Sequence, residues 1–432
     1  MHHFGLICPP GTSHVTGLTT VARELCQRGH RATVFNILDV EELAHKEAVG
    51  FHPLGVAAHP KGFFRQFSDE FRQLHGLDAL RFGLKAALGE ITMLLEEAPD
   101  ALRAAGVTTL IVDQGQPAGS TIAERLGLPF VTICNAVPSD PDPRVPPAVT
   151  PWGPATSWSD RARIWASYRF IDMAVSPIRR RINSYRTKWS LKPLRSLYET
   201  FSPILELAQE TSEFDFPRQS PPRQFHYIGL IRRAGSLDIA FPFDRLDGRP
   251  LVYGSLGTVA GDTKGIFRML ADACAPLPVQ LVISLGGTGD ADQYADLPGD
   301  PIVVNYAPQL TILGRAAVTV CHAGNNTVLE SMACGVPVVA VPLNTDQYGV
   351  AARLVQCGAG ERISLGQLDA PRLRERIAKV LSQPSYAQRA RAICESLDRA
   401  GGERRAADLI EQTLDLLSRT HRPDNLEYRR AR

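Results

Sequence analysis

TVCHAGNNTVLESMACGVPVVAVPLNTDQ, the stretch from Thr319 to Gln347, contains two apolar strands joined by one helix. The first strand stops at His322, and small and polar residues follow before a helix that ends near Gly335. A second apolar strand then leads into a polar loop that ends in Asp346 and Gln347. Strand, helix and strand in this order, with short connections, predict part of a parallel α/β sheet.

The polar residues after the first strand have the chemistry of an anion site. Ala323 and Gly324 let the backbone approach a ligand closely. Asn325–Thr327 open a helix, and a helix N-terminus offers free N–H groups and partial positive charge. His322 can donate one more hydrogen bond, and Glu330 can accept from a ribose diol. The stretch therefore predicts a cradle for a nucleotide diphosphate; a capped helix in a plain α/β sheet is the alternative.

The alternation of strands and helices continues on both sides of this stretch. Strands are expected at 4–8, 32–37, 110–112 and 130–133, and again at 251–254, 279–284, 302–304, 318–321 and 338–341. Prolines cluster between the two series, as in a linker. We therefore expect an α/β protein with two doubly wound, Rossmann-like domains that face a cleft, with functional residues just after the strands.

The expected boundaries follow from these series. They are an N-terminal domain at 1–216, a linker at 217–245, a C-terminal domain at 246–403, a helix at 404–420 that packs back toward the N-terminal domain, and a loose tail at 421–432. Residues 161–210 are expected to be helical. Within them, residues 161–195 hold ten Arg and Lys and a single acid, Asp172. Because the net charge of the 432 residues is only +2, the rest of the chain is net negative.

Composition excludes several classes of protein. The small net charge argues against nucleic acid as a partner. The eight cysteines form no C-x-x-C pair, so they are expected to be free thiols in a reduced cytosol. No apolar run approaches the length of a membrane span, and the short apolar run at 4–8 is not expected to be a signal peptide. A cytoplasmic protein is expected. The D-x-D sequences at 140–142 and 290–292 lie in loops and are not expected to bind a metal.

The motifs around the opening stretch form an ordered set. They are Tyr306, Pro308-Gln309, His322, Gly324, Asn326, Thr327, Glu330, Gly335-Val336-Pro337, Pro342 and Asp346-Gln347. This order resembles the signature of the UDP-glycosyltransferase superfamily, whose two-domain architecture is called GT-B. The sequence departs from the plant pattern at Tyr306 and Asn325, where plant members carry tryptophan.

The resemblance implies a role for each residue on the donor side. Tyr306 would stack on uracil and the backbone of Ala307 would pair with its edge. Gln309 and Glu330 would hold the ribose, which favours UDP over dTDP. Phosphates would be bound by Ser255, His322, Asn326 and Thr327, with Gly324 allowing close approach. Asp346 and Gln347 would bind the sugar hydroxyls, and Gln347 leans toward glucose.

The acceptor side is expected at the end of the first strand. His14 follows it in PPGTSH and stands at the start of a helix, where a simple polar cap is the alternative role. The resemblance makes His14 the catalytic base and Asp113, at the end of the strand 110–112, its orienting partner. The positive helix N-terminus should keep this imidazole neutral. One displacement would then give a β-glycoside from UDP-glucose, with no metal and no cofactor.

The acceptor is expected to be lipophilic. Phenylalanines crowd residues 59–95, and aromatic and basic side chains alternate in 161–195, as at a membrane interface. Peripheral membrane contact through 161–195 is therefore expected; a solvated helical face is the alternative. The segments HFGLICPP, DQYGVAARLVQCGAG and AGGERRAADLIEQ are similar to bacterial zeaxanthin glucosyltransferases, which glycosylate carotenoid hydroxyls. Flavonoid, macrolide and sterol acceptors remain open.

Other enzyme classes lack their motifs here. A dehydrogenase would need G-x-G-x-x-G at a βα turn, and a P-loop enzyme would need G-x-x-x-x-G-K-[ST]; neither opens a helix in this chain. A sugar-nucleotide epimerase should lack the pairing of His14 with Asp113. A non-catalytic nucleotide-sugar binder would keep the donor side alone.

Overall fold

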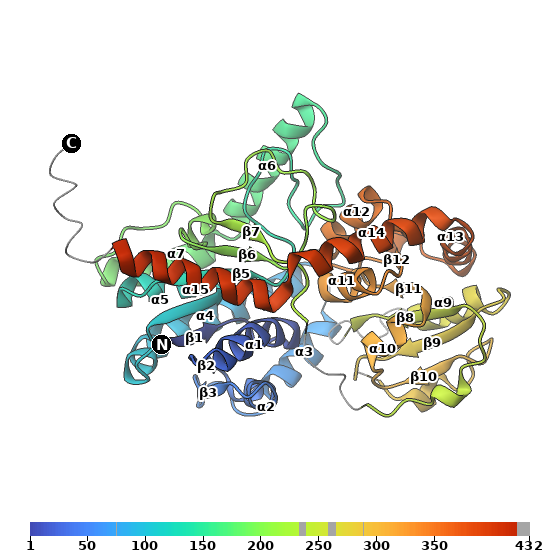
Figure 1. Ribbon diagram of the computed structural model, residues 1–432, viewed down its shortest axis with the longest axis horizontal. Coiled ribbons are helices and arrows are strands. Elements are labelled where there is room, and N and C mark those ends of the chain that lie inside the picture. Colours follow the sequence, from blue (N-terminus) through green and yellow to red (C-terminus); the bar gives the residue numbers. More distant parts are fainter. Residues whose placement is uncertain (75, 233–238, 258–264, 288, 421–432) are drawn as a thin grey trace.

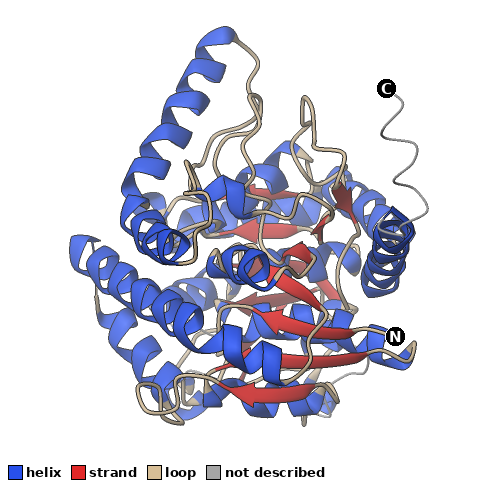
Figure 2. Ribbon diagram, turned by 90° about the vertical axis from the view of Figure 1, so that its left-hand side faces the viewer, coloured by secondary structure: helices blue, strands red, loops and turns tan. Residues whose placement is uncertain are grey.

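The computed structural model describes residues 1–74, 76–232, 239–257, 265–287 and 289–420. Its first half is a seven-stranded parallel sheet in the order β3-β2-β1-β4-β5-β6-β7, with helices on both faces (Figures 1 and 2). The strands are β1 (His3–Ile7), β2 (Arg31–Asn36), β3 (Gly50–Pro53), β4 (Thr109–Asp113), β5 (Phe130–Cys134), β6 (Glu206–Ala208) and β7 (Phe225–Tyr227). The helices are α1 (Thr12–Gln27), α2 (Glu41–Lys46), α3 (Phe63–Gln73), α4 (Gly76–Ala104), α5 (Ala118–Leu126), α6 (Trp158–Ala174) and α7 (Ser176–Lys188).

The second half is a six-stranded parallel sheet in the order β10-β9-β8-β11-β12-β13. Its strands are β8 (Leu251–Ser255), β9 (Gln280–Ser284), β10 (Ile302–Val304), β11 (Ala316–Cys321), β12 (Val338–Ala340) and β13 (Gly360–Arg362). Its helices are α9 (Ile266–Cys274), α10 (Gln309–Leu313), α11 (Asn325–Ala333), α12 (Gln347–Gln356), α13 (Ala370–Ser382) and α14 (Pro384–Ala400). The two-domain α/β prediction is confirmed.

Each sheet has one point where the strand order reverses. In the first sheet β1 lies between β2 and β4, and in the second β8 lies between β9 and β11. Loops leave such a point in opposite directions and open a crevice at the carboxyl ends of the strands. In the first sheet, His14 lies after β1 and Asp113 is the last residue of β4. In the second sheet, Ser255 is the last residue of β8 and His322 directly follows β11. The fold therefore puts the predicted residues at both crevices.

Two expectations about the middle of the chain are wrong. Residues 161–210 are helical only as far as Lys188, and Glu206–Ala208 form strand β6. Strand β7, inside the expected linker, pairs with β6 and forms the edge of the first sheet. Strand β6 has only three residues, which is too short for a periodic pattern to reveal, whereas the apolar run at 225–230 does mark the position of β7. The tail at 421–432 lies outside the described residues.

The last helix, α15 (Gly402–Thr420), returns to the first domain (Figure 1). Its buried residues share the core of α1 and the first sheet, and Ile410 and Leu414 are among them. Arg28, just after α1, donates hydrogen bonds to Asp408 and Glu411 at 2.7 and 2.8 Å. The helix thus belongs to the N-terminal core, although it follows the C-terminal domain in the chain.

A buried ion-pair network joins the two domains. Arg353 of α12 donates from Nε to Asp215 Oδ1 at 2.7 Å, and both side chains are 0% exposed. Asp215 also accepts from Arg218 at 2.9 Å and from the Tyr227 hydroxyl at 2.7 Å. Beside them, burial and the Asp215 carboxylate raise the pKa of Glu210 well above its usual range.

Candidate active site

His14 and Asp113 form a hydrogen-bonded pair. His14 Nδ1 lies 2.8 Å from Asp113 Oδ2, and because a carboxylate can only accept, Nδ1 carries the proton. Nε2 is then the nitrogen that can act as a base. The other carboxylate oxygen of Asp113 accepts from the backbone N–H of Gly115 at 2.7 Å. The Asp113 side chain is 0% exposed, so these bonds fix it within the protein.

The pKa of His14 departs from the sequence-based expectation. Burial lowers it, but the carboxylates of Asp113, Asp346 and Glu90 raise it more, and the net pKa lies above its usual value. This upward direction runs against the expectation that the helix N-terminus favours the neutral imidazole. Among the groups that raise the pKa, Asp113 acts most strongly, through its charge and its hydrogen bond.

Asn135, at the end of β5, supports the same carboxylate. Its Nδ2 donates to Asp113 Oδ2 at 2.7 Å and to the backbone oxygen of His14 at 3.3 Å. Gly17 makes room for it, since a Cβ at Gly17 would lie 2.0 Å from Asn135 Oδ1. Sequence reasoning missed Asn135, because nothing in the local pattern links it to residues far away in the chain.

In the C-terminal domain, His322 packs against two glycines. A Cβ added to Gly324 would lie 2.5 Å from His322 Nε2, and one added to Gly257 would lie 2.7 Å from His322 Cε1. A larger residue at either position would therefore collide with the imidazole. Burial lowers the pKa of His322 to about 4, so the imidazole is neutral near pH 7 and can act through a hydrogen bond rather than a charge. Ser255 ends the neighbouring strand β8 and is buried. These side chains surround the start of α11.

The N-terminus of α11 has the form expected of an anion site. No side chain within the described residues caps its first N–H groups. Ala323, just before it, has a left-handed φ of 62°, a conformation that costs a non-glycine residue energy and often marks a functional loop. Asn326 and Thr327 lie in the first turn. The predicted phosphate ligands are thus brought together.

The predicted nucleoside ligands also cluster. Gln309 donates from Nε2 to Glu330, and its Oε1 accepts from the Tyr253 hydroxyl at 2.9 Å. Burial raises the pKa of Glu330, although Gln309 lowers it in part. Tyr306 and Ala307 shortly precede Gln309 in the chain. The Tyr306 side chain is 43% exposed, and Ala307 is buried. An exposed ring next to hydrogen-bonding side chains can accept a base and a ribose; these roles stay predictions.

Asp346 and Gln347 lie at the start of α12. Asp346 raises the pKa of His14, which places its carboxylate within electrostatic reach of the predicted base. Gln347 is instead bound to its own loop, where its Oε1 accepts from the backbone of Leu343 at 2.8 Å and of Asn344 at 3.1 Å. In the part of the chain that the structure describes, the Asp346 carboxylate accepts a single side-chain hydrogen bond, from the Thr345 hydroxyl at 3.0 Å.

A direct hydrogen bond connects the two halves of the site. Gln209, just after β6, donates from Nε2 to Asn326 Oδ1 at 2.7 Å and to the backbone oxygen of Asn135 at 2.5 Å. Through Asn135 the contact continues to Asp113. The predicted base and the predicted phosphate cradle therefore share one polar network, which the sequence did not reveal.

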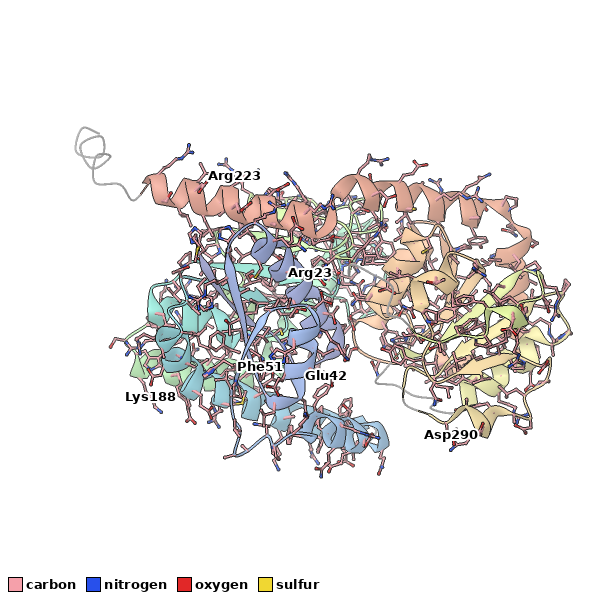
Figure 3. All side chains as sticks on the ribbon, turned by 60° about the horizontal axis from the view of Figure 1, so that its bottom comes forward. Arg23, Glu42, Phe51, Lys188, Arg223 and Asp290 are labelled. Carbon is pink, nitrogen blue, oxygen red and sulfur yellow. The ribbon has the colours of Figure 1, made fainter. Side chains whose placement is uncertain are left out.

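The carboxylates of the first D-x-D sequence, at 140–142, are already engaged. Arg218 donates to both oxygens of Asp140, and the backbone of Arg144 and Gln219 donates to Asp142. Asp290 caps a short helix on the outer rim of the C-terminal domain (Figure 3). Among the described residues, no group of three His, Cys, Asp or Glu could hold a metal ion.

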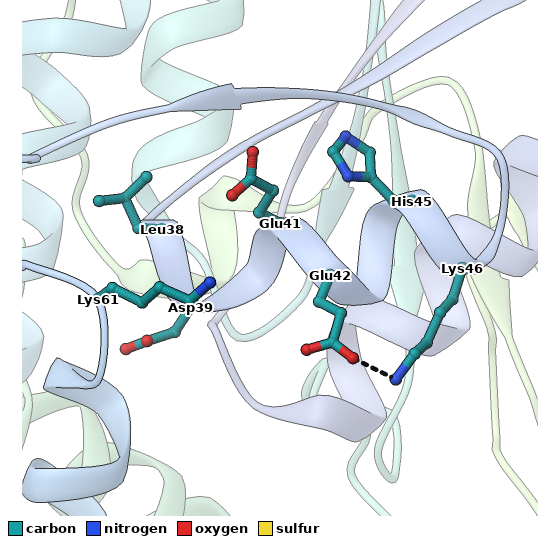
Figure 4. Close-up of a pocket in the computed structure, with 7 residues that line it drawn as sticks. All are labelled: Leu38, Asp39, Glu41, Glu42, His45, Lys46 and Lys61. Atoms are coloured by element: carbon teal, nitrogen blue, oxygen red, sulfur yellow. Dashed lines mark ion pairs between the residues drawn. The ribbon is translucent and has the colours of Figure 1, made fainter.

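Two surface hollows lie outside the predicted site. One of about 710 Å³ is formed by charged residues of α2 and the adjacent loops, where Glu42 and Lys46 make an ion pair (Figure 4). The other, of about 730 Å³, lies between α4 and the loop after β3 and is lined in part by Leu84, Leu88 and Met93. Leu88 lines this hollow, whereas Glu90, two positions further along α4, faces nearly the opposite side of the helix.

Comparisons with known proteins agree with this geometry. The family described as UDP-glucoronosyl and UDP-glucosyl transferase matches residues 196–396. A zeaxanthin glucosyltransferase of Pantoea ananas is 35% identical over 419 residues, which cover 96% of each chain. The chain belongs to the UDP-glucosyl transferase family. A second zeaxanthin glucosyltransferase, of Pseudescherichia vulneris, is 34% identical and covers 96% of this chain and 98% of its own.

Solved structures show the same GT-B fold. The glycosyltransferase of kitacinnamycin superposes with a TM-score of 0.74 at 23% identity, covering 95% of this chain and 99% of its own. The calicheamicin glycosyltransferase CalG4 gives 0.73 at 20% identity, with coverage of 96% and 99%. The protein is therefore a glycosyltransferase, and the epimerase and the non-catalytic binder are no longer supported.

Glu90 of α4 is a further residue of this transferase that the motifs did not reveal. Burial raises its pKa to about 7, while His14 and the hydrogen bond from Gln116 lower it in part. Gln116 Nε2 donates to Glu90 Oε1 at 2.9 Å. A glutamate inside a 29-residue helix carries no signal in the sequence, because only the fold brings it near His14.

We expect the pH profile of the transferase to report on His14. Because the base must be unprotonated, kcat/KM should rise with pH and level off above an inflection higher than the usual imidazole value of about 6.5. Asp113→Asn removes the largest upward influence, so the inflection should move to lower pH. The plateau value of kcat/KM should also fall, by about 10²- to 10⁴-fold, because the variant no longer holds the His14 imidazole in the orientation that a base needs. An unmoved inflection in steady-state assays of the variant would contradict this assignment.

Proposed function

We propose that the protein transfers a hexose, glucose, from UDP-glucose to a hydroxyl of a lipophilic acceptor. The single observation that carries the proposal is the 2.8 Å hydrogen bond between His14 and Asp113, in electrostatic reach of Asp346 on the donor side. A base at the acceptor face and an anion cradle on the donor domain are the two parts that glycosyl transfer needs.

The proposed reaction is a single displacement. The acceptor hydroxyl gives its proton to His14 Nε2 while its oxygen attacks the anomeric carbon of the sugar. The bond from that carbon to the diphosphate breaks, and UDP leaves with its electron pair. The N–H groups at the start of α11 and the neutral His322 stabilise the leaving anion. Attack opposite the leaving group converts an α-linked donor into a β-glycoside, and no metal takes part.

The donor assignment depends on Glu330 and Gln309. A carboxyl beside an amide suits the two hydroxyls of a ribose, and a deoxyribose offers one fewer. UDP is therefore proposed over dTDP. Glucose is proposed from the similarity to zeaxanthin glucosyltransferases.

A lipophilic acceptor is supported by stacked phenylalanines between α3 and α4. The rings of Phe67 and Phe82 are 5.3 Å apart and tilted by 11°, and Phe67 and Phe71 are 5.9 Å apart. All three rings are partly exposed. Phe82 lies eight residues, or about 12 Å, along α4 from Glu90. We propose a carotenoid alcohol such as zeaxanthin, because the two similar enzymes carry that name.

An acceptor screen tests the proposal. The protein is incubated with UDP-glucose, UDP-galactose or dTDP-glucose and with zeaxanthin, a flavonoid, a macrolide or a sterol, with and without a chelator. We expect a β-glucoside of zeaxanthin from UDP-glucose, identified by mass spectrometry and by the coupling of the anomeric proton. If only a flavonoid, macrolide or sterol glucoside forms, the acceptor assignment is wrong, but the proposed mechanism still holds. An α-glycoside, or loss of activity with the chelator, would overturn the mechanism.

The membrane contact expected for residues 161–195 also belongs to this proposal. No helix among the described residues is long and apolar enough to cross a bilayer. A carotenoid dissolves in a membrane, so an enzyme that glycosylates it would need to approach the bilayer surface.

A further inference from the structure

Helix α6 carries apolar side chains on two sides. Ile164 and Tyr168 face inward, where they pack in one buried cluster and the Tyr168 hydroxyl donates to the backbone oxygen of Val145 at 3.1 Å. On the outer side, Trp158 is 83% exposed, Trp165 65% and Met173 63%. A surface helix normally turns polar residues outward, so the outer side is unusual.

The outer residues cover one broad side of the helix. Trp158 and Trp165 are seven positions apart, close to two helical turns, so they lie on one line, whereas Met173 lies about 60° and Phe170 about 120° around the helix axis from Trp158. Phe170 is 65% exposed. We call these four side chains the outer face of α6. No contact among the described residues covers them, and large exposed apolar patches usually mark an interaction site.

Arginines border the outer face. Arg161, Arg163 and Arg169 are exposed, and the guanidinium of Arg169 lies 5.9 Å from the centre of the Trp165 ring. The acids nearby are already engaged: Asp160 caps α6 and pairs with Arg163, and Asp172 pairs with Arg179, so Arg161 and Arg169 are the cations left to face a partner. Tryptophan and arginine together are the side chains of a membrane interface, where the ring enters the headgroup region and the cation meets anionic lipid.

We infer that the outer face of α6 docks on an anionic lipid surface. The helix stands away from the body of the N-terminal domain, so a flat surface can reach it (Figure 1). A second copy of the chain is a poorer occupant, because a symmetric contact would bring these arginines against each other. The inference rests on the proposed function, because a lipophilic acceptor would give the enzyme a reason to bind a membrane. It narrows the expected membrane contact from residues 161–195 to one face of α6.

The other aromatic residues of that segment are excluded by their packing. Trp189 stacks edge to face on Tyr185 at 5.8 Å and lies under Arg125. Tyr185 and Tyr168 are buried. The expected contact through the whole segment is therefore replaced by a face that begins earlier, at Trp158.

Vesicle sedimentation tests the inference without any substrate. The protein is mixed with phosphatidylcholine vesicles with or without phosphatidylglycerol, at low and high salt. We expect binding to the anionic vesicles that weakens with salt, and a loss of about tenfold or more in Trp158→Ser/Trp165→Ser. Leu416→Ser is the matched control, because Leu416 is equally exposed, at 63%, on α15. It should bind as the wild type does.

Fluorescence locates the contact. In Trp152→Phe/Trp189→Phe the two remaining tryptophans are those of the outer face, and their emission should shift to the blue and be quenched by brominated lipid. Unchanged emission, or a serine variant that still sediments like the wild type, overturns the inference. So does a dimer, seen by light scattering, that the serine variant dissociates while vesicles stay unbound. Turnover of a water-soluble acceptor in the serine variant separates loss of docking from failure of the proposed reaction.

Discussion

Replacing His14 with alanine is expected to lower kcat by about 10²- to 10⁴-fold, the usual contribution of general-base catalysis. The acceptor hydroxyl then has no group to take its proton as it attacks. UDP binding should be unchanged, since the donor cradle belongs to the other domain. Steady-state kinetics and calorimetric titration with UDP measure the two quantities separately.

The control for this variant is His45→Ala. His45 is exposed on α2, away from the predicted site, and its replacement should leave both quantities unchanged. Equal losses in the two variants, or loss of UDP binding in His14→Ala, would mean that His14 supports the fold rather than the chemistry.

Replacing Arg353 with alanine is expected to have the largest effect on stability. Asp215 would keep its bonds from Arg218 and Tyr227 but lose one of the two cations that pair with it within the domain junction. Removing one partner of a fully buried ion pair typically costs about 3–5 kcal/mol. The guanidinium also stacks 4.5 Å from the centre of the Phe216 ring, and that contact is lost as well.

Urea unfolding measures this effect, and exposed Arg372 provides the control. Its ion pair with Asp369 spans 3.5 Å at the surface, so Arg372→Ala should change the free energy of unfolding by less than about 1 kcal/mol. Arg353→Ala/Asp215→Ala should be less destabilised than the sum of its single variants, because no unpaired charge remains. Additive losses would show that the pair is not coupled.

The sequence was most informative where function is encoded locally. His322, Gly324, Asn326 and Glu330 lie within nine residues, so their spacing alone predicted one helix N-terminus with its ligands. His14 and Asp113 required the family resemblance, since they are 99 positions apart. The alternating strands predicted both sheets, because buried parallel strands have a strong apolar signal.

Residues that act through tertiary contacts were not predictable. Asn135, Gln209 and Glu90 are ordinary polar residues until β5, β6 and α4 bring them beside His14 and Asn326. The sign of the His14 pKa shift failed for the same reason, since it depends on carboxylates from three separate segments. The exposed apolar face of α6 was also hard to locate from the sequence. Apolar side chains on two sides of the helix hide the amphipathic period by which a surface helix is recognised.

The return of α15 to the first domain means that the polypeptide passes between the domains twice, once after β7 and once where Gly402 donates to the backbone oxygen of Ile228 at 2.6 Å. The two crossings lie side by side, and with the buried pair of Arg353 and Asp215 they tie the domains together at more than one place. They also dictate how chimaeras must be cut. An N-terminal half that ends near residue 230 would leave the groove of α1 open to water, whereas one that also carries 402–420 would keep its core closed.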